Sequence, residues 1–364
     1  MADDEERAPA PADAWRAFVA GLGDAGERLA RRTEALSRED QADGFRALLR
    51  ALHNQLGRFE VDRERPELVP FNGWRQKLFM DNPDFLYWVA DVRPDRRYRV
   101  HGARGGAAFM SLTAYAASGV VDAAAAARLD SDSLHFDAAG RFSVTLSAVR
   151  PASGDWLQLP EGASAVWVRQ FYDDVAHDSL GSCAIEALAG GPPPPFIDAE
   201  RFARQLARLG PTLARVSAAL GAVEQEERPR ANQVRHWSEM QGGAAFTEPA
   251  IHYLRGAWEL EPDEALVLEG AAVPCRYWNV LLYSRFLNSL DYRHRTVSLT
   301  GARIPLRDGR YRLVLAARDP GVPGWLDTEG RRFGLFVLRW LRPEKTPELP
   351  ELRVVRGAEL ARTP

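Results

Sequence analysis

Polar side chains that could carry acid–base chemistry gather within seven residues in the C-terminal third of the chain. They are Asn288, Ser289, Asp291, Tyr292, Arg293 and His294. A carboxylate and an imidazole could act as acid and base, and a guanidinium beside them could hold a carboxylate or phosphate. We therefore assign Asp291 and His294 as a candidate catalytic pair and Arg293 as a candidate anion contact, with Asn288 and Tyr292 as ligand contacts.

A plainer interpretation of this segment is an exposed polar loop in which His294 is satisfied locally. If the segment were a strand, alternation would place Asp291 and Arg293 on one face and Tyr292 and His294 on the other. That geometry would weaken a direct contact between Asp291 and His294. Function is still a serious alternative, because loops held by a rigid scaffold often carry sites.

Two further groups could contact a ligand. The run Asp81-Asn82-Pro83-Asp84 is first of all a turn, but Asn82 and Asp84 are also candidate ligand contacts. In the run 277–283, alternation places Tyr277, Asn279 and Tyr283 on one face, where they could form part of an aromatic wall. Trp278 falls on the other face, which favours a role in the core.

Motifs for metals and cofactors are missing from the sequence. The seven histidines form no His-x-His or His-x-x-x-His, and there is no Cys-x-x-Cys. No Walker motif, dinucleotide fingerprint or Gly-x-Ser-x-Gly elbow occurs. We therefore predict no metal site and no cofactor.

Composition narrows the class of partner. The chain has 364 residues with 47 basic and 50 acidic side chains, and the net charge of −3 gives no basic field for nucleic acid. No apolar stretch is long enough to span a membrane. Two distant cysteines and an acidic, Pro/Ala-rich start favour a cytoplasmic protein.

The elements that must position these residues change in character along the chain. We predict a mostly β protein with a helical N-terminus and a helical linker, built from two duplicated β-sandwich or jelly-roll-like units. The predicted segments are a disordered start (1–12), a helical region (13–80), a first β unit (81–174), a Pro-rich and helical linker interrupted near Pro211 (192–246), a second β unit (247–342) and a loosely attached tail (343–364).

The two β units can be laid over each other, which indicates an internal repeat. Tyr87 matches Tyr253, and Arg169 matches Arg339. The offset between matched positions drifts only from 166 residues at Pro83 and Pro249 to 170 residues at the two arginines. Trp156 and Trp325 also match, and we expect these tryptophans to pack in the core and the matched arginines to pair or cap at the surface.

The second unit resembles a known family. The run Arg276–Tyr283, the Asp308-Gly309 turn, Gly324-Trp325-Leu326 and the closing Phe336–Trp340 match, in order, the pattern of the bacterial family called domain of unknown function 1214. The resemblance covers about residues 250–342. It implies a β-rich C-terminal domain with a β domain upstream, and it implies no activity.

Three functions remain open. The first, which we favour, is a cofactor-independent enzyme that acts on a small sugar- or lipid-like molecule at the polar segment of the second unit. The second is a non-catalytic module that binds a sugar or lipid-like ligand in an aromatic cleft between the units. The third is a structural or interaction protein whose N-terminal helices form a homo-oligomer.

Overall fold

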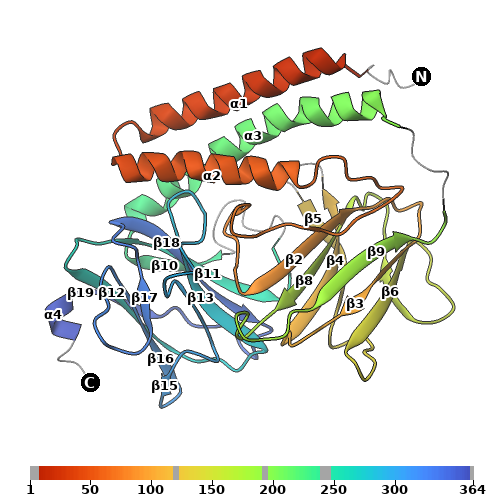
Figure 1. Ribbon diagram of the computed structural model, residues 1–364. Coiled ribbons are helices and arrows are strands. Elements are labelled where there is room, and N and C mark those ends of the chain that lie inside the picture. The colour runs from red at the N-terminus through yellow and green to blue at the C-terminus, as the bar shows by residue number, and fades with distance from the viewer. Residues whose placement is uncertain (1–7, 118–122, 191–195, 238–246, 361–364) are drawn as a thin grey trace.

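Three long helices lie along one side of the molecule. The computed structural model describes residues 8–117, 123–190, 196–237 and 247–360. The helices are α1 (Pro11–Thr33), α2 (Arg38–Leu56) and α3 (Ala199–Glu227), and together they cover both β units (Figure 1). Ser37 caps α2 by accepting a hydrogen bond from the backbone of Asp40, and Asp198 caps α3 through the backbone of Arg201.

The first unit consists of two mostly antiparallel β-sheets. Its strands are β1 (Val69–Pro70), β2 (Phe85–Asp91), β3 (Tyr98–Ala103), β4 (Phe109–Ala117), β5 (Ala123–Asp130), β6 (Arg141–Ser147), β7 (Asp155–Gln158), β8 (Ala165–Phe171) and β9 (Ser182–Ala187). The orders are β1-β2-β8-β4-β5 and β7-β6-β3-β9. In β6 the buried Phe142, Val144 and Leu146 alternate with more exposed residues, as a strand covered on one face requires.

The second unit repeats this arrangement. Its strands are β10 (Gln233–His236), β11 (Ile251–Glu259), β12 (Glu264–Ala271), β13 (Tyr277–Tyr283), β14 (Ser298–Thr300), β15 (Leu306–Arg307), β16 (Arg310–Ala316), β17 (Trp325–Asp327), β18 (Phe333–Leu341) and β19 (Glu351–Arg356). The main orders are β10-β11-β18-β13-β14 and β15-β16-β12-β19, with β17 parallel to β16. A one-turn helix η1 (Arg228–Arg230) precedes β10 and a short helix α4 (Gly357–Leu360) follows β19.

The matching strand orders confirm a mostly β fold with a helical N-terminal part and a central helix. Each unit is a sandwich, and both sheets of the first contribute to one buried cluster that includes Val100, Val144 and Val168. The expected core packing is confirmed for Trp325, which is half-buried and packs against the cluster that includes Val267 and Val314. It is wrong for Trp156, which is half-buried and belongs to none of the apolar clusters of the described residues. The indole N–H of Trp156 donates to the carbonyl of Ser147 and that of Trp325 to the carbonyl of Ala316.

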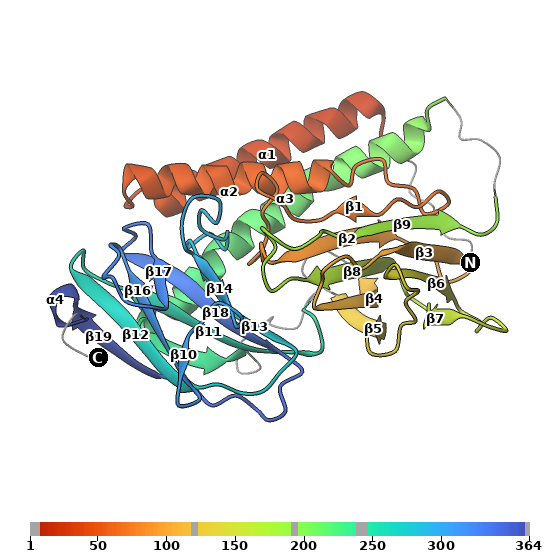
Figure 2. The ribbon, with the colours of Figure 1, turned by 60° about the horizontal axis from the view of Figure 1, so that its bottom comes forward.

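A separate apolar cluster joins the two units, which lie next to each other beneath the helices (Figure 2). Phe85 and Phe171 from the first unit pack against Tyr277 from the second, with ring centroids 5.3 and 6.1 Å apart. This contact brings β2 and β8 close to β11, β13 and β18 and so sets the relative position of the sheets.

Several boundaries differ from the prediction. The first unit begins at Val69 and ends at Ala187, and the second begins at Gln233 and ends at Arg356. The predicted loose tail is wrong for residues 351–356, because β19 pairs along β12 over six residues. Such edge strands escape prediction because their residues are half exposed and lack alternation.

The helices also differ from the prediction. The helix α3 runs through Pro211 without a break, because its buried face is held against α1. The buried face of α1 includes the small Ala14 and Ala25, whereas the larger Trp15 and Val19 are 58 and 47 % exposed. Of the predicted disordered start, residues 1–7 lie outside the described residues, and α1 begins at Pro11.

In the ranges that the structure describes, no helix combines the length and the apolar character needed to cross a membrane.

The close approach of α1 and α3 depends on two glycines. A Cβ added at Gly21 would lie 2.5 Å from the Cα of Gly210, which is far inside van der Waals contact with backbone.

We therefore expect Gly21→Ala to lower the free energy of unfolding by about 1–3 kcal/mol in chemical denaturation, because the helices must separate. The matched control is Gly23→Ala, where a Cβ meets nothing within 4 Å and a gain of up to about 1 kcal/mol is expected. Equal effects of the two substitutions would contradict this helix packing.

Candidate ligand-binding site

A cavity of about 450 Å³ lies where the two β units meet α3. Strands β2 and β8 line it from the first unit, and β11 and β18 from the second. The segments that precede β2 and β11 complete it. Its lining residues are Phe71, Asn72, Leu78, Phe79, Met80, Phe85, Tyr87, Trp167, Arg169, Ala219, Ala222, Val223, Trp237, Thr247, Glu248, Tyr253, Arg255, Leu287, Val337 and Arg339. A volume of this size suits a small organic molecule.

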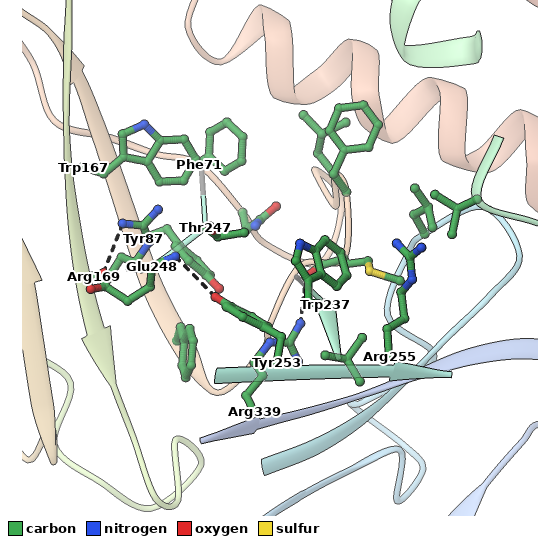
Figure 3. A pocket seen from close by; sticks show the side chains of 18 of the residues that line it. Phe71, Tyr87, Trp167, Arg169, Trp237, Thr247, Glu248, Tyr253, Arg255 and Arg339 are labelled. Atoms are coloured by element: carbon green, nitrogen blue, oxygen red, sulfur yellow. Dashed lines mark hydrogen bonds and ion pairs between the residues drawn. The ribbon is translucent and has the colours of Figure 1, made fainter. Parts of the chain in front are cut away.

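Two matched pairs of residues face each other across this cavity. Tyr87 on β2 lies directly opposite Arg169 on β8, and Tyr253 on β11 lies directly opposite Arg339 on β18. Figure 3 shows the first pair entering from one unit and the second pair from the other. The repeat therefore places one tyrosine and one arginine of each unit at the same cavity.

Arg169 is 2 % exposed and has a carboxylate partner. Its guanidinium donates to the hydroxyl of Tyr115 at 3.1 Å and to the carboxylate of Glu248 at 3.4 Å. Glu248 also accepts from the hydroxyl of Ser111 at 2.7 Å and pairs with Arg128 at 2.5 Å. The charge of Arg169 is thus neutralised by an acid from the segment that precedes β11 in the other unit.

Arg339 is 4 % exposed and lacks an equivalent partner. One of its nitrogens donates to the hydroxyl of Tyr283 at 2.6 Å and to the carbonyl of Met80 at 3.4 Å. The other, Nη1, is buried and finds no hydrogen-bond partner among the described residues. Among the residues that the structure describes, no carboxylate lies within 4 Å of the Arg339 guanidinium. The position that matches Glu248 in the repeat is Asn82, which carries no charge.

The backbone next to Arg339 is held in an uncommon conformation. Phe79 and Met80 both have positive φ angles, 43° and 58°, and Leu287 has a φ of 59°. The amide of Met80 donates to the carbonyl of Leu287 at 2.7 Å, which fixes the segment against the second unit. Strained backbone of this kind is typical of functional sites.

The tyrosines of the cavity remain protonated at neutral pH. Burial raises the pKa of Tyr253 to about 12, although the nearby guanidinium of Arg339 opposes that shift. Burial likewise holds the pKa of Tyr87 well above its usual value against the opposing effect of Arg339. Their hydroxyls can therefore donate hydrogen bonds to an acceptor in the cavity.

The remaining walls are largely apolar and aromatic. Phe71 and Trp167 pack with ring centroids 4.3 Å apart, and Trp237 packs against Tyr253 at 5.8 Å. Arg255 lies over the ring of Trp237 at 4.6 Å, and its charge is neutralised by Glu227 at 2.7 Å. The cavity therefore combines an apolar interior with one guanidinium that has no carboxylate partner among the described residues.

Four of the predicted ligand contacts meet one another beside the cavity. The amide of Asn279 donates to Asp84 at 2.9 Å and to Asn82 at 3.3 Å, and the hydroxyl of Tyr277 donates to Asp84 at 3.3 Å. All four are buried, and burial raises the pKa of Asp84 although Ser298, Asn279 and Tyr277 donate to it. They form a polar contact between the units. A fifth, Tyr283, contacts two residues that line the cavity, since its hydroxyl accepts from Arg339 and donates to the carbonyl of Met80 at 3.2 Å.

The predicted catalytic residues lie elsewhere, at a second cavity of about 290 Å³ beside α2. The segment is a loop, as the plainer interpretation of the sequence has it, and Asp291–Arg295 forms a turn closed by the amide of Arg295 on the carbonyl of Asp291. The turn brings His294 Nδ1 to 3.0 Å from the Asp291 carboxylate. Burial raises the pKa of Asp291, but hydrogen bonds from His294 and from the amide of Arg293 outweigh it and lower the pKa overall. His294 and Arg293 are exposed, and Asp291 lines the cavity.

The other two predicted contacts support cations at this second cavity. Asn288 accepts a hydrogen bond from Arg50 at 3.3 Å, and the ring of Tyr292 lies 4.5 Å from the ammonium of Lys77. Neither Asn288 nor Tyr292 contacts Asp291 and His294 through a hydrogen bond of their side chains in the described part of the chain. The predicted polar segment thus contains two neighbouring sets of side chains. Asp291 and His294 contact each other, whereas Asn288 and Tyr292 contact Arg50 and Lys77.

Sequence reasoning missed the principal residues of the larger cavity. It placed Arg169 and Arg339 at the surface, which is wrong, and it named neither Tyr87 nor Tyr253 as a contact. The signal was present, because both pairs recur at matched positions of the two units, and each arginine lies two residues before the end of a strand whose residues are all buried. Within the residues that the structure describes, no three His, Cys, Asp or Glu side chains gather as they would around a metal ion.

Comparisons with known proteins bear on the fold. No protein-family model matches the chain, and no curated protein matches it. The crystal structure of an uncharacterised protein from Burkholderia cenocepacia is similar over 95 % of this chain and 97 % of its own, with 28 % identity and a TM-score of 0.89. A protein from Vibrio parahaemolyticus matches over 94 % of this chain and 99 % of its own, with 14 % identity and a TM-score of 0.49. The first similarity extends the observed arrangement of helices and β units to a second protein.

Lys77 at the second cavity gives a prediction about pH. Burial lowers its pKa from 10.5 to about 8. Between these values the unfolded chain holds the proton and the folded chain does not, so stability from this group rises with pH. Relative to Lys77→Met, we expect the free energy of unfolding of the wild type to increase by about 2 kcal/mol from pH 7 to pH 9.5, measured by urea denaturation. A difference that does not change with pH would contradict the buried, perturbed state of Lys77.

Proposed function

We propose that the protein binds a small amphipathic carboxylate in the cavity between its two β units. The observation that carries this proposal is Arg339, whose buried Nη1 has no hydrogen-bond partner among the described residues. A carboxylate accepts two parallel hydrogen bonds from a guanidinium, and it would supply both the missing acceptor and the missing charge.

The charges around the cavity favour a ligand with a single negative group. Arg169 and Arg255 are already paired with Glu248 and Glu227. Only Arg339 lines the cavity without a carboxylate within ion-pair distance in the described residues. An unpaired buried charge is costly, so a ligand that neutralises it gains more than one that meets a paired arginine. Tyr253, on the strand next to that of Arg339, and Tyr87, on β2 of the other unit, have protonated hydroxyls that could add hydrogen bonds to the same group.

The walls favour an apolar or aromatic body. Phe71, Trp167 and Trp237 present rings, and Leu78, Met80 and Val337 present aliphatic or thioether groups. Because apolar burial contributes roughly 25 cal/mol per Å², a ligand that fills such a cavity is bound chiefly through its hydrocarbon part. The carboxylate then fixes its orientation.

This geometry supports binding better than catalysis. The described lining contains no histidine or cysteine, and its one carboxylate, Glu248, is engaged by Arg128, Arg169 and Ser111. The site matches the second hypothesis drawn from the sequence, an aromatic cleft between the units, with a carboxylate in place of a neutral sugar. A catalytic role for Asp291 and His294 stays a prediction.

Three further proposals concern the origin of the two units by duplication, the family of the second unit and the location of the protein in the cell. The matching strand orders support duplication of one unit. The motifs shared with domain of unknown function 1214 fall on β13, β17 and β18 of one unit, which supports membership of residues 250–342 in that family. The two free cysteines support a cytoplasmic location.

Binding can be tested with a matched acid and alcohol. We expect 4-phenylbutyrate to quench tryptophan fluorescence through Trp167 and Trp237 and to bind at least about tenfold more tightly than 4-phenyl-1-butanol, since only the acid meets Arg339. Arg339→Gln should remove most of this preference. The control Arg353→Gln changes an exposed arginine of β19, paired with Glu269, and should bind as the wild type does.

Equal binding of the acid and the alcohol by the wild type would refute the proposal, and this comparison does not depend on the variant folding. Unchanged affinity of Arg339→Gln for the acid would refute it as well.

A further inference from the structure

The second cavity is a separate polar chamber between α2, the segment before β2 and the turn after β13. Five basic side chains line it, from Arg46, Arg50, Lys77, Arg295 and Arg331. Only two acidic side chains line it, from Asp291 and Glu329. Its volume of about 290 Å³ is sufficient for a small anion with a short organic group.

Three of these cations are neutralised by neighbouring acids. Arg46 is paired with Asp43. Arg331 pairs with Asp43 at 3.0 Å and with Glu329 at 3.0 Å. Arg295 pairs with Asp327 at 2.7 Å. These contacts engage Asp43, Glu329 and Asp327, and the other lining acid, Asp291, lies 3.0 Å from Nδ1 of His294.

Lys77 and Arg50 are buried and have only neutral partners at hydrogen-bond distance. Lys77 is 1 % exposed, and its ammonium donates to the carbonyls of Ser289 at 2.7 Å and Leu290 at 3.0 Å. Arg50 is 8 % exposed and donates to the side chain of Asn288. In the ranges that the structure describes, neither cation has a carboxylate within 4 Å.

An acid that attracts both cations, Asp81, already accepts hydrogen bonds from another residue. Asp81 attracts both cations, but its carboxylate accepts from the amide of Ser289 at 2.9 Å and from the hydroxyl of the same residue at 2.7 Å. Burial lowers the pKa of Lys77 to about 8 and also lowers that of Arg50, against the attraction of Asp81. The two cations are therefore held at a cost that a bound anion would reduce.

An aromatic ring keeps the cations together. Trp74 has the ammonium of Lys77 4.3 Å from its ring centre, the guanidinium of Arg293 at 4.8 Å and that of Arg50 at 5.4 Å. The negative face of an indole partly screens the repulsion between such groups. Arg293, the anion contact expected from the sequence, thus lies close to the same cluster, although its side chain is exposed.

We propose that Lys77 and Arg50 form a second site, independent of the carboxylate site, which binds the phosphoryl group of inorganic phosphate or of a small phosphate monoester. Two cations without carboxylate partners match the two negative charges of a phosphate, and their ammonium and guanidinium donors match its oxygen acceptors. A singly charged carboxylate would leave one of the two uncompensated.

The test is isothermal titration of the whole chain with inorganic phosphate and with glycerol 3-phosphate, at constant ionic strength set by chloride. We expect the wild type to bind at least one of them. Arg50→Gln and Lys77→Gln each keep a donor for the neutral acceptors but lose the charge, and each should weaken binding by roughly tenfold or more. Tighter binding of the ester than of phosphate would identify an organic ligand, and equal binding would identify the free ion.

The matched control is Arg46→Gln, which changes an arginine of the same cavity that Asp43 already neutralises, and it should bind within about twofold of the wild type. Absence of binding by the wild type to both probes would overturn the proposal, whether or not the variants fold. Binding that survives both charge-removing substitutions would overturn it too.

Discussion

A guanidinium that leaves water must find its hydrogen bonds inside the protein, and this requirement governs the contact between the two β units. Arg169 and Arg339 occupy matched positions on β8 and β18, the strands at the middle of their sheets. Each is held by a tyrosine of its own unit, Tyr115 or Tyr283. Each then reaches the segment that precedes the first long strand of the other unit, at Glu248 or at Met80. Each unit therefore contacts a segment of the other unit through a buried arginine, and these two contacts hold the units together.

The contacts of Arg169 and Arg339 with the other unit are alike in position and differ in charge, and this difference creates the site. Glu248 supplies a carboxylate to Arg169, whereas its counterpart Asn82 turns to Asn279 and leaves Arg339 with neutral partners. The aromatic rings around both arginines exclude water and make the missing partner more costly. The second cavity follows the same logic, because Lys77 and Arg50 are also buried beside aromatic rings with neutral acceptors. In both places the protein has buried positive charge that it does not neutralise with its own acids within ion-pair distance in the described residues.

The sequence allowed the mostly β fold, its helical N-terminal part and its central helix to be predicted, because these depend on local alternation and helical periodicity. The expected core position holds for Trp325 and fails for Trp156, which is half-buried outside the apolar clusters of the described residues. The sequence could not place Arg169 and Arg339, since an arginine near the end of an apolar strand is usually at the surface, whereas here each arginine is covered by the other unit. It grouped Asp291 and His294 correctly in sequence but could not foresee the turn that joins them, because their spacing fits a strand as well as a turn. The edge strand β19 was missed for a related reason, since its half-exposed residues lack the alternation of a buried strand.

The account depends most on the position of Arg339 as the anion contact between the units. The most direct test is a crystal structure of the protein with 4-(4-bromophenyl)butyrate, in which anomalous scattering locates the bromine. The account predicts the carboxylate within hydrogen-bond distance of the Arg339 guanidinium and the bromine among the rings of Phe71, Trp167 and Trp237. A ligand bound elsewhere, or one whose carboxylate points away from Arg339 in this cavity, would contradict it.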